Sequence, residues 1–161
     1  MKIRELLIPE LEHEVALTEK FLDRIPKNKM NWKAHKKSMT LQQLGSHLAE
    51  IPWWITGTMS RDEMNMDDYK PPLNSSPKEM IQVLKAAAAD AKAAMEVDDA
   101  EYEKPWRMIK GGKVVLEMSK YKVLRYVVLN QIPHHRAQLG VYLRLLGESV
   151  PSTYGPSADE Q

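Results

Sequence analysis

Four stretches of the 161-residue sequence place apolar residues three or four positions apart, the spacing of one face of an α-helix. They predict helices over residues 3–24, 40–59, 77–95 and 120–146. Helices of this kind must bury their apolar faces against one another. The sequence therefore predicts a single domain, residues 1–161, with an all-α fold that forms a four-helix bundle.

Residues typical of helix ends support two of these boundaries. Thr40 to Gln43 form a T-x-x-Q capping box at the start of the second helix. Ser76 to Glu79 combine a serine cap, a proline at the first helical position and a glutamate at the third. Pro52 lies inside the second helix and is expected to kink it or break it in two.

A short β-hairpin is predicted before the last helix. Residues 106–110 and 113–118 flank Gly111-Gly112, a pair that suits a tight turn. The polar residues 60–75 and the acidic residues 96–103 are interpreted as loops. The expected architecture is thus a bundle with a hairpin or loop insertion.

Histidines on two of the predicted helices indicate a metal site. His134 and His135 stand side by side in the last helix, and His47 lies on the apolar stripe of the second. A buried imidazole is costly unless its ring nitrogens have partners, and imidazoles from two helices commonly hold a divalent ion inside a bundle. Gln131 lies four residues before His135 and so shares its face of the helix. The candidate ligands are His47, Gln131 and His135.

Two imidazoles and one amide oxygen would make a weak site with open positions, which a catalytic metal requires. The amide oxygen is a harder donor than imidazole and should lower the affinity for zinc or nickel. His134 points about 100° away from His135 and is expected to support the site or face solvent. Arg136 and Gln138 are expected to orient a ligand or a carboxylate substrate there. Pro133 predicts a kink or a local widening of the helix.

A structural role for the same residues is the alternative interpretation. A single histidine on an apolar stripe is often a core residue bonded to a backbone carbonyl, and Gln131 could bond His47 or His135 directly. The chain would then be a non-catalytic bundle used for dimerisation or partner binding. Trp53, Trp54 and Tyr142 could instead surround a small-molecule pocket, and none of these interpretations is excluded by the sequence.

Composition excludes several other classes. The formal net charge is +1 with no basic tract, so nucleic acid is not an expected partner. There is no cysteine, which excludes disulfides, thiolate ligands and a cysteine nucleophile. The N-terminus lacks an apolar signal segment, and no apolar run approaches the ~18 residues of a membrane span. We expect a cytoplasmic protein that does not enter membranes.

Three segments resemble one known family. Asn130–Arg144 is similar to the N-H-x-x-H-H-R-(G/A)-Q-L segment of the DinB/YfiT-like family of metal-dependent proteins. Trp32–Leu48 looks like the family's entry to the second helix and its first histidine, and Val150–Glu160 looks like its closing segment. The resemblance implies a four-helix bundle, often homodimeric, with three histidines that bind a nickel- or zinc-like ion. Carried over by position, the ligands are His47, residue 131 and His135, and the chain departs from the pattern because residue 131 is glutamine.

The resemblance also implies a function. Relatives include thiol-dependent transferases and isomerases, in which the metal would activate a low-molecular-weight thiol. The expected function is that of a divalent-metal-binding protein, with nickel or zinc favoured over iron. It would be a metal-dependent hydrolase or a thiol-dependent transferase that acts on a small molecule.

Overall fold

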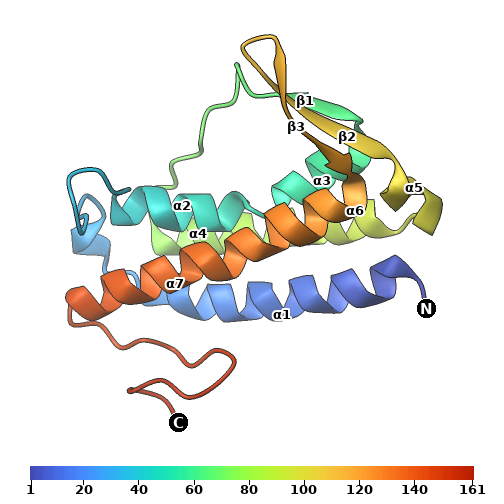
Figure 1. Cartoon of the computed structure of the whole chain (residues 1–161). Helices are drawn as coiled ribbons and strands as arrows, with labels where there is room; N and C mark the ends of the chain where they lie inside the picture. The colour runs from blue at the N-terminus through green and yellow to red at the C-terminus, as the bar shows by residue number, and fades with distance from the viewer.

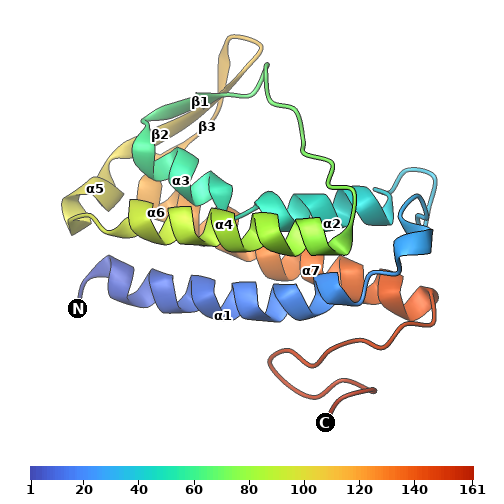
Figure 2. The ribbon, with the colours of Figure 1, turned by 180° about the vertical axis from the view of Figure 1, so that it is seen from behind.

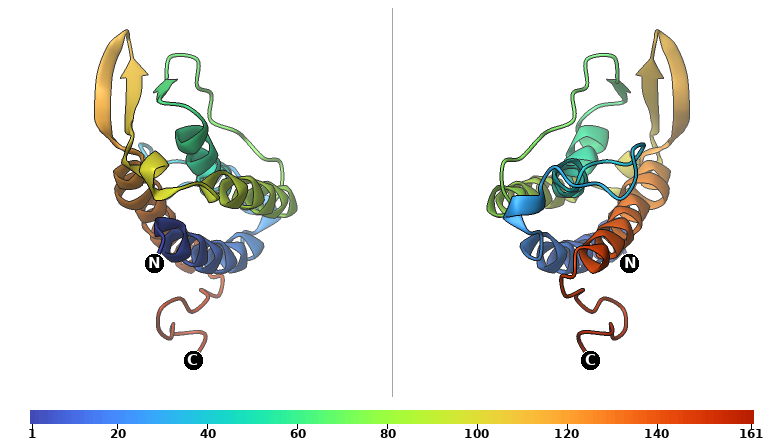
Figure 3. Two further views of the ribbon diagram at one scale, coloured as in Figure 1. Left: turned by 90° about the vertical axis from the view of Figure 1, so that its right-hand side faces the viewer. Right: turned by 90° about the vertical axis from the view of Figure 1, so that its left-hand side faces the viewer.

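The computed structural model describes residues 1–161, and four helical segments form its core (Figure 1). These segments are α1 (Ile3–Asp23), α2 (Leu41–Glu50) with α3 (Trp53–Ser60), α4 (Pro77–Met95) and α7 (Leu129–Leu145). Helix α4 contacts α1, α2 and α3, whereas α7 contacts α1 and α2. The four segments therefore surround one continuous apolar core, and Figure 3 shows the arrangement of these helices end-on.

The helix ends follow the local signals in the sequence. The Thr40 hydroxyl accepts a hydrogen bond from the Gln43 amide (3.1 Å), and the Gln43 side chain accepts one from the Thr40 amide (2.8 Å). Ser76 caps α4 by accepting from the Glu79 amide (3.2 Å). Pro52 breaks the second predicted helix, because α2 ends at Glu50 and α3 begins at Trp53. No helix combines the length and the apolar character that crossing a bilayer requires.

A three-stranded sheet at one end corrects the all-α prediction. Strands β2 (Pro105–Lys110) and β3 (Lys113–Ser119) form the predicted antiparallel hairpin, and β1 (Glu63–Asn65) pairs in parallel with β2. The fold is therefore mostly helical with a small sheet. Strand β1 has only three residues, so its exposed–buried–exposed pattern is too short to predict a strand from the sequence.

The acidic stretch also contains a short helix, α5 (Asp99–Glu103), where the sequence predicted a loop. Tyr102 accounts for the difference, because its ring is fully buried and its hydroxyl donates to the Met95 carbonyl (2.7 Å). The Asp99 carboxylate accepts a hydrogen bond from the Ile3 amide (3.0 Å). One buried aromatic ring and one long-range bond thus order a single turn in an otherwise polar segment.

The last predicted helix is continuous but not uniform. It begins with α6 (Lys120–Lys122), passes through a π-helical segment, η2 (Val123–Val128), and continues as α7. The Leu129 amide donates to the Leu124 carbonyl, five residues back, which widens this turn. A widened turn is therefore present, but it lies five to ten residues before Pro133, and α7 continues through the proline as a regular α-helix rather than widening beside His135.

The sheet and the C-terminal tail lie on opposite sides of the bundle (Figures 1 and 3). A loop follows β1, arches beside the sheet and returns to the start of α4, as Figure 2 shows. Side chains from this loop, the sheet and η2 line one cavity together with His47 of α2, and the candidate site lies there.

Candidate functional site

His47 and His135 face each other across α2 and α7. Their ring centroids are 4.6 Å apart, and the ring planes are inclined by 80°. The side chain of His47 is 21% exposed, and His135 is partly buried. The structure thus brings together the two histidines that the sequence singled out on separate helices.

Each imidazole is held through its Nδ1 atom. His47 Nδ1 lies 2.8 Å from Glu50 Oε1, and His135 Nδ1 lies 3.0 Å from Gln138 Oε1. Because a carboxylate oxygen and an amide oxygen are acceptors, Nδ1 is the donor in both bonds. In a neutral imidazole of this tautomer Nε2 carries the lone pair, and neither Nε2 forms a hydrogen bond within the protein. The Nε2 atoms of two facing rings are therefore free to act as donors to a metal ion.

Glu50 is a buried carboxylate without a lysine or arginine partner. It is 6% exposed, and its only ion pair is with His47. Its Oε1 atom also accepts a hydrogen bond from the Tyr69 hydroxyl. Burial and the Glu50 carboxylate raise the pKa of Tyr69, so the phenol remains a donor. A carboxylate behind an imidazole whose other nitrogen is free is the arrangement that orients metal-binding histidines.

Burial lowers the pKa of His135, and the neighbouring His47 and His134 rings act in the same direction. The bond to Gln138 opposes this shift only in part. The lowered pKa favours the uncharged form of His135, which is the form that binds metals.

Gln138 links two adjacent histidines on α7. Its amide oxygen accepts from His135, and its amide nitrogen lies 3.2 Å from His134 Nε2. His134 itself is exposed, and its ring centroid lies 4.8 Å from that of His135. Gln138 is thus in the orienting position that the sequence suggested for it.

Gln131 lies one turn before His135 and shares a cavity wall with His47. It forms no hydrogen bond with either histidine, so the direct bond required by the structural interpretation is not present. No three histidine, cysteine, aspartate or glutamate side chains lie close enough together to hold an ion by themselves. Two facing imidazoles, with Gln131 on the cavity wall that it shares with His47, are therefore the side chains that could donate to an ion here.

A cavity of about 170 Å³ opens beside these residues. The bundle contributes His47, Ile51 and Trp54, and the sheet contributes Trp106 and Met108. The remaining lining residues come from the loop, the π-helical segment and the start of α7: Tyr69, Val123, Val127, Val128 and Gln131. We call this space the inner cavity.

A second, more open cavity of about 460 Å³ meets the first at His47 and Tyr69, which line both. Its other walls come from the start of α2 and from the loop before α4, including Gln43 and Pro71-Pro72. We call this space the outer groove. A molecule in the outer groove would reach the inner cavity past His47 and Tyr69.

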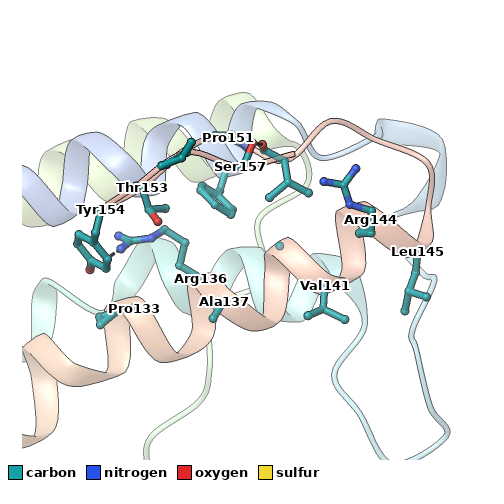
Figure 4. A pocket seen from close by; sticks show the side chains of 15 residues that line it. Pro133, Arg136, Ala137, Val141, Arg144, Leu145, Pro151, Thr153, Tyr154 and Ser157 are labelled. Atoms are coloured by element: carbon teal, nitrogen blue, oxygen red, sulfur yellow. Dashed lines mark hydrogen bonds between the residues drawn. The ribbon is translucent and has the colours of Figure 1, made fainter. Parts of the chain in front are cut away.

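Arg136 does not join the histidine cluster, which corrects the role expected for it. Its side chain projects to the other side of α7, toward Tyr154 and the C-terminal tail (Figure 4). It is 2% exposed and bonds Glu14 Oε2 (2.6 Å) and the Tyr154 hydroxyl (2.7 Å). Successive helical residues diverge by about 100°, so neighbours such as His135 and Arg136 serve different surfaces. The cavity of about 460 Å³ between α7 and the tail is thus separate from the histidines.

Of the aromatic residues proposed for a pocket, only Trp54 lines the inner cavity. Trp53 packs edge-on against Trp54 and is 38% exposed. Tyr142 packs against Trp32 and donates to the Met39 carbonyl (3.1 Å).

Sequence reasoning missed Glu50 and Tyr69. Glu50 carried a usable signal, because it lies three residues after His47 and so on the same face of α2. Tyr69 lies in an irregular loop, and no spacing connects it with the histidines. The wall residues from the sheet could not be assigned without the topology.

Comparison with known proteins identifies relatives of the whole chain. The model of the DinB family matches residues 4–161. A DinB-like protein from Bacillus cereus ATCC 10987 has a TM-score of 0.73 and 24% identity, over 95% of this chain and 98% of that one. A DinB-like protein (YjoA) from Bacillus subtilis has a TM-score of 0.67 and 14% identity, over 96% and 99% of the two chains. At these identities the two structures establish the fold alone. No curated protein matches the sequence significantly.

Proposed function

The chain belongs to the DinB family, and we propose that it binds a divalent metal ion through His47, His135 and the amide oxygen of Gln131. One observation carries the proposal: two imidazoles face each other at 4.6 Å, each fixed through Nδ1 and each with a free Nε2. The uncompensated buried carboxylate of Glu50 adds to it, because a cation on His47 would balance its charge.

The set of donor atoms determines which ion binds and how tightly it is held. Neutral imidazoles suit nickel and zinc better than ferrous iron, which agrees with the general order of divalent affinities. Gln131 contributes a neutral oxygen in place of a third imidazole, so binding is weak and positions remain open. A bound ion would lower the pKa of a water or thiol and present it to an electrophile.

Each protein side chain then has a defined task. Glu50 and Gln138 fix the tautomers and the ring orientations of His47 and His135. Tyr69 donates to Glu50 and stands between the two cavities. The reaction we propose is a metal-dependent hydrolysis or a thiol-dependent transfer on a small molecule, carried out by a homodimer. Sedimentation velocity would measure the assembly state.

Metal titration of variants tests this proposal. Purified protein is stripped with chelator and titrated with nickel or zinc by calorimetry, beside elemental analysis of the untreated protein. We expect His47→Ala and His135→Ala to lose binding. His134→Ala, which removes the exposed neighbour, should retain it. Wild-type protein that binds neither ion would overturn the proposal.

The role of Glu50 gives a second expected result. Glu50→Gln keeps the shape of the side chain but removes its charge, and we expect it to lower metal affinity about 10–100-fold. Tyr69→Phe removes one hydrogen bond to Glu50 and leaves the carboxylate, so its effect should be smaller. Calorimetric titration of both variants measures the difference. Equal affinity in Glu50→Gln and wild type would show that Glu50 does not act through His47.

A metal-free binding module is the second candidate function. It is favoured because no three histidine, cysteine, aspartate or glutamate side chains are arranged so that they could hold one ion. In that case His47→Ala lowers the melting temperature, chelator does not change it, and the cavities still bind a small molecule. The same titrations therefore decide between the two candidates.

A further inference from the structure

The inner cavity has a size that suits one compact group. Its volume is about 170 Å³. A protein cavity of roughly 150 Å³ lined by apolar side chains stays dry and binds benzene. The inner cavity therefore has room for a single aromatic ring or for a branched alkyl group of about the same volume.

The walls of the inner cavity select against polar groups. Eight of its ten lining residues are hydrophobic. The remaining two are His47 and Gln131, which stand together on the side where the proposed metal binds. A polar or charged group placed deeper would lose its hydration among mainly hydrocarbon and aromatic walls, where the indole N–H of Trp106 is the unbonded polar group. The occupant must therefore be apolar except at the end beside His47.

The cavity exists because of the parts of the fold that depart from a plain bundle. Trp106 and Met108 come from β2, and Val123, Val127 and Val128 come from the π-helical segment. A π-helical turn holds an additional residue, which widens the helix at this wall, and such turns occur often at functional sites. Trp106 is fully buried and its indole N–H has no acceptor in the protein. Strand β2 and the π-helical segment together form the wall that closes the inner cavity.

We propose that the inner cavity binds the apolar end of the substrate, a single aromatic ring or a compact branched alkyl group. The substrate enters through the outer groove, and its polar atoms remain beside His47 and Gln131. The substrate class is thus a small molecule with one bulky apolar group next to its reacting centre. Sugars and phosphorylated metabolites do not fit this cavity. The inference rests on the proposed function for the reacting end only, because the cavity itself does not require a metal.

The test uses chelator-treated protein and two probes of nearly equal size, benzene and the polar heterocycle pyridazine. Trp54 and Trp106 line the cavity, so tryptophan fluorescence reports occupancy, and the melting temperature reports binding to the folded state. We expect saturable binding of benzene and a higher melting temperature. Pyridazine should bind at least tenfold more weakly. Equal binding of both probes, or no saturable binding of benzene, would overturn the inference.

Two variants locate the binding site. Val127→Phe fills the inner cavity from its partly exposed wall and should lower benzene affinity at least tenfold. Val141→Phe makes the same change on the exposed face of α7, at a residue that is 58% exposed, and should leave the affinity unchanged. Met108→Ala enlarges the cavity and should admit naphthalene, which the wild type should exclude. An equal loss of benzene affinity in Val127→Phe and Val141→Phe, without naphthalene binding in Met108→Ala, would show that the probe binds outside the inner cavity.

The outcome is independent of the metal proposal. Metal binding without benzene binding would overturn the cavity inference and leave the proposed metal function standing. Benzene binding in a protein that binds neither nickel nor zinc would support the cavity inference and overturn the metal proposal. The two failures are therefore distinguishable.

Discussion

Arg136→Ala is expected to lower the free energy of unfolding by about 3–5 kcal/mol. Arg136 and Glu14 are only 2% and 6% exposed, and the Arg136 Nη1 atom lies 2.6 Å from Glu14 Oε2. Removing the guanidinium leaves a buried carboxylate without its cation, which is the costly case for a buried ion pair. Tyr154 would also lose the hydrogen bond that helps to hold the tail against α7 (Figure 4).

Arg144→Ala is the matched control. Arg144 lies two turns later on α7 and pairs with Asp159 of the same tail, but its side chain is 49% exposed. An exposed pair of this kind contributes about 0–1 kcal/mol. Urea unfolding of both variants measures the difference. Equal destabilisation by the two substitutions would show that burial of the Arg136–Glu14 pair has no special importance.

The helices were predictable because their signals are local. Apolar spacing placed α1 and α4 nearly at their observed ends, and Thr40 and Ser76 form the expected caps. Pro52 divides the second helix because a proline cannot donate the backbone bond that a continuous helix needs. Each of these features depends on residues within one or two turns.

The sheet and α5 depend on distant residues, and this limited what the sequence could predict. Strand β1 is held by its pairing with β2, some forty positions later, where Met64 lies opposite Met108. Helix α5 is held by the buried ring of Tyr102 and by the bond between Asp99 and Ile3. Neither segment is long enough to show a periodic pattern that would identify it. The candidate site shows the same division: its histidines lie on predicted helices, whereas Tyr69 comes from a loop.

Gln131→His is expected to strengthen the proposed metal site. It would replace a neutral amide oxygen with an imidazole one turn before His135, on the face that borders the same cavity as His47. When nickel or zinc is present at 100 times the dissociation constant, binding stabilises the folded state by about 2.7 kcal/mol. For a chain of this length that corresponds to a rise in melting temperature of roughly 5–10 °C. The wild type should need a higher metal concentration for the same rise.

Asn130→His is the control for this experiment. It adds an imidazole at the adjacent exposed position, which points about 100° away from Gln131. Thermal melts of the wild type and both variants, across a nickel or zinc titration and with chelator, give the comparison. If the metal-dependent rise in melting temperature is no larger in Gln131→His than in Asn130→His, positions 47, 131 and 135 do not converge on one ion, and the metal proposal is overturned. If the rise is larger in Gln131→His alone, the three positions do converge. The glutamine alone then explains why the natural chain binds its metal weakly.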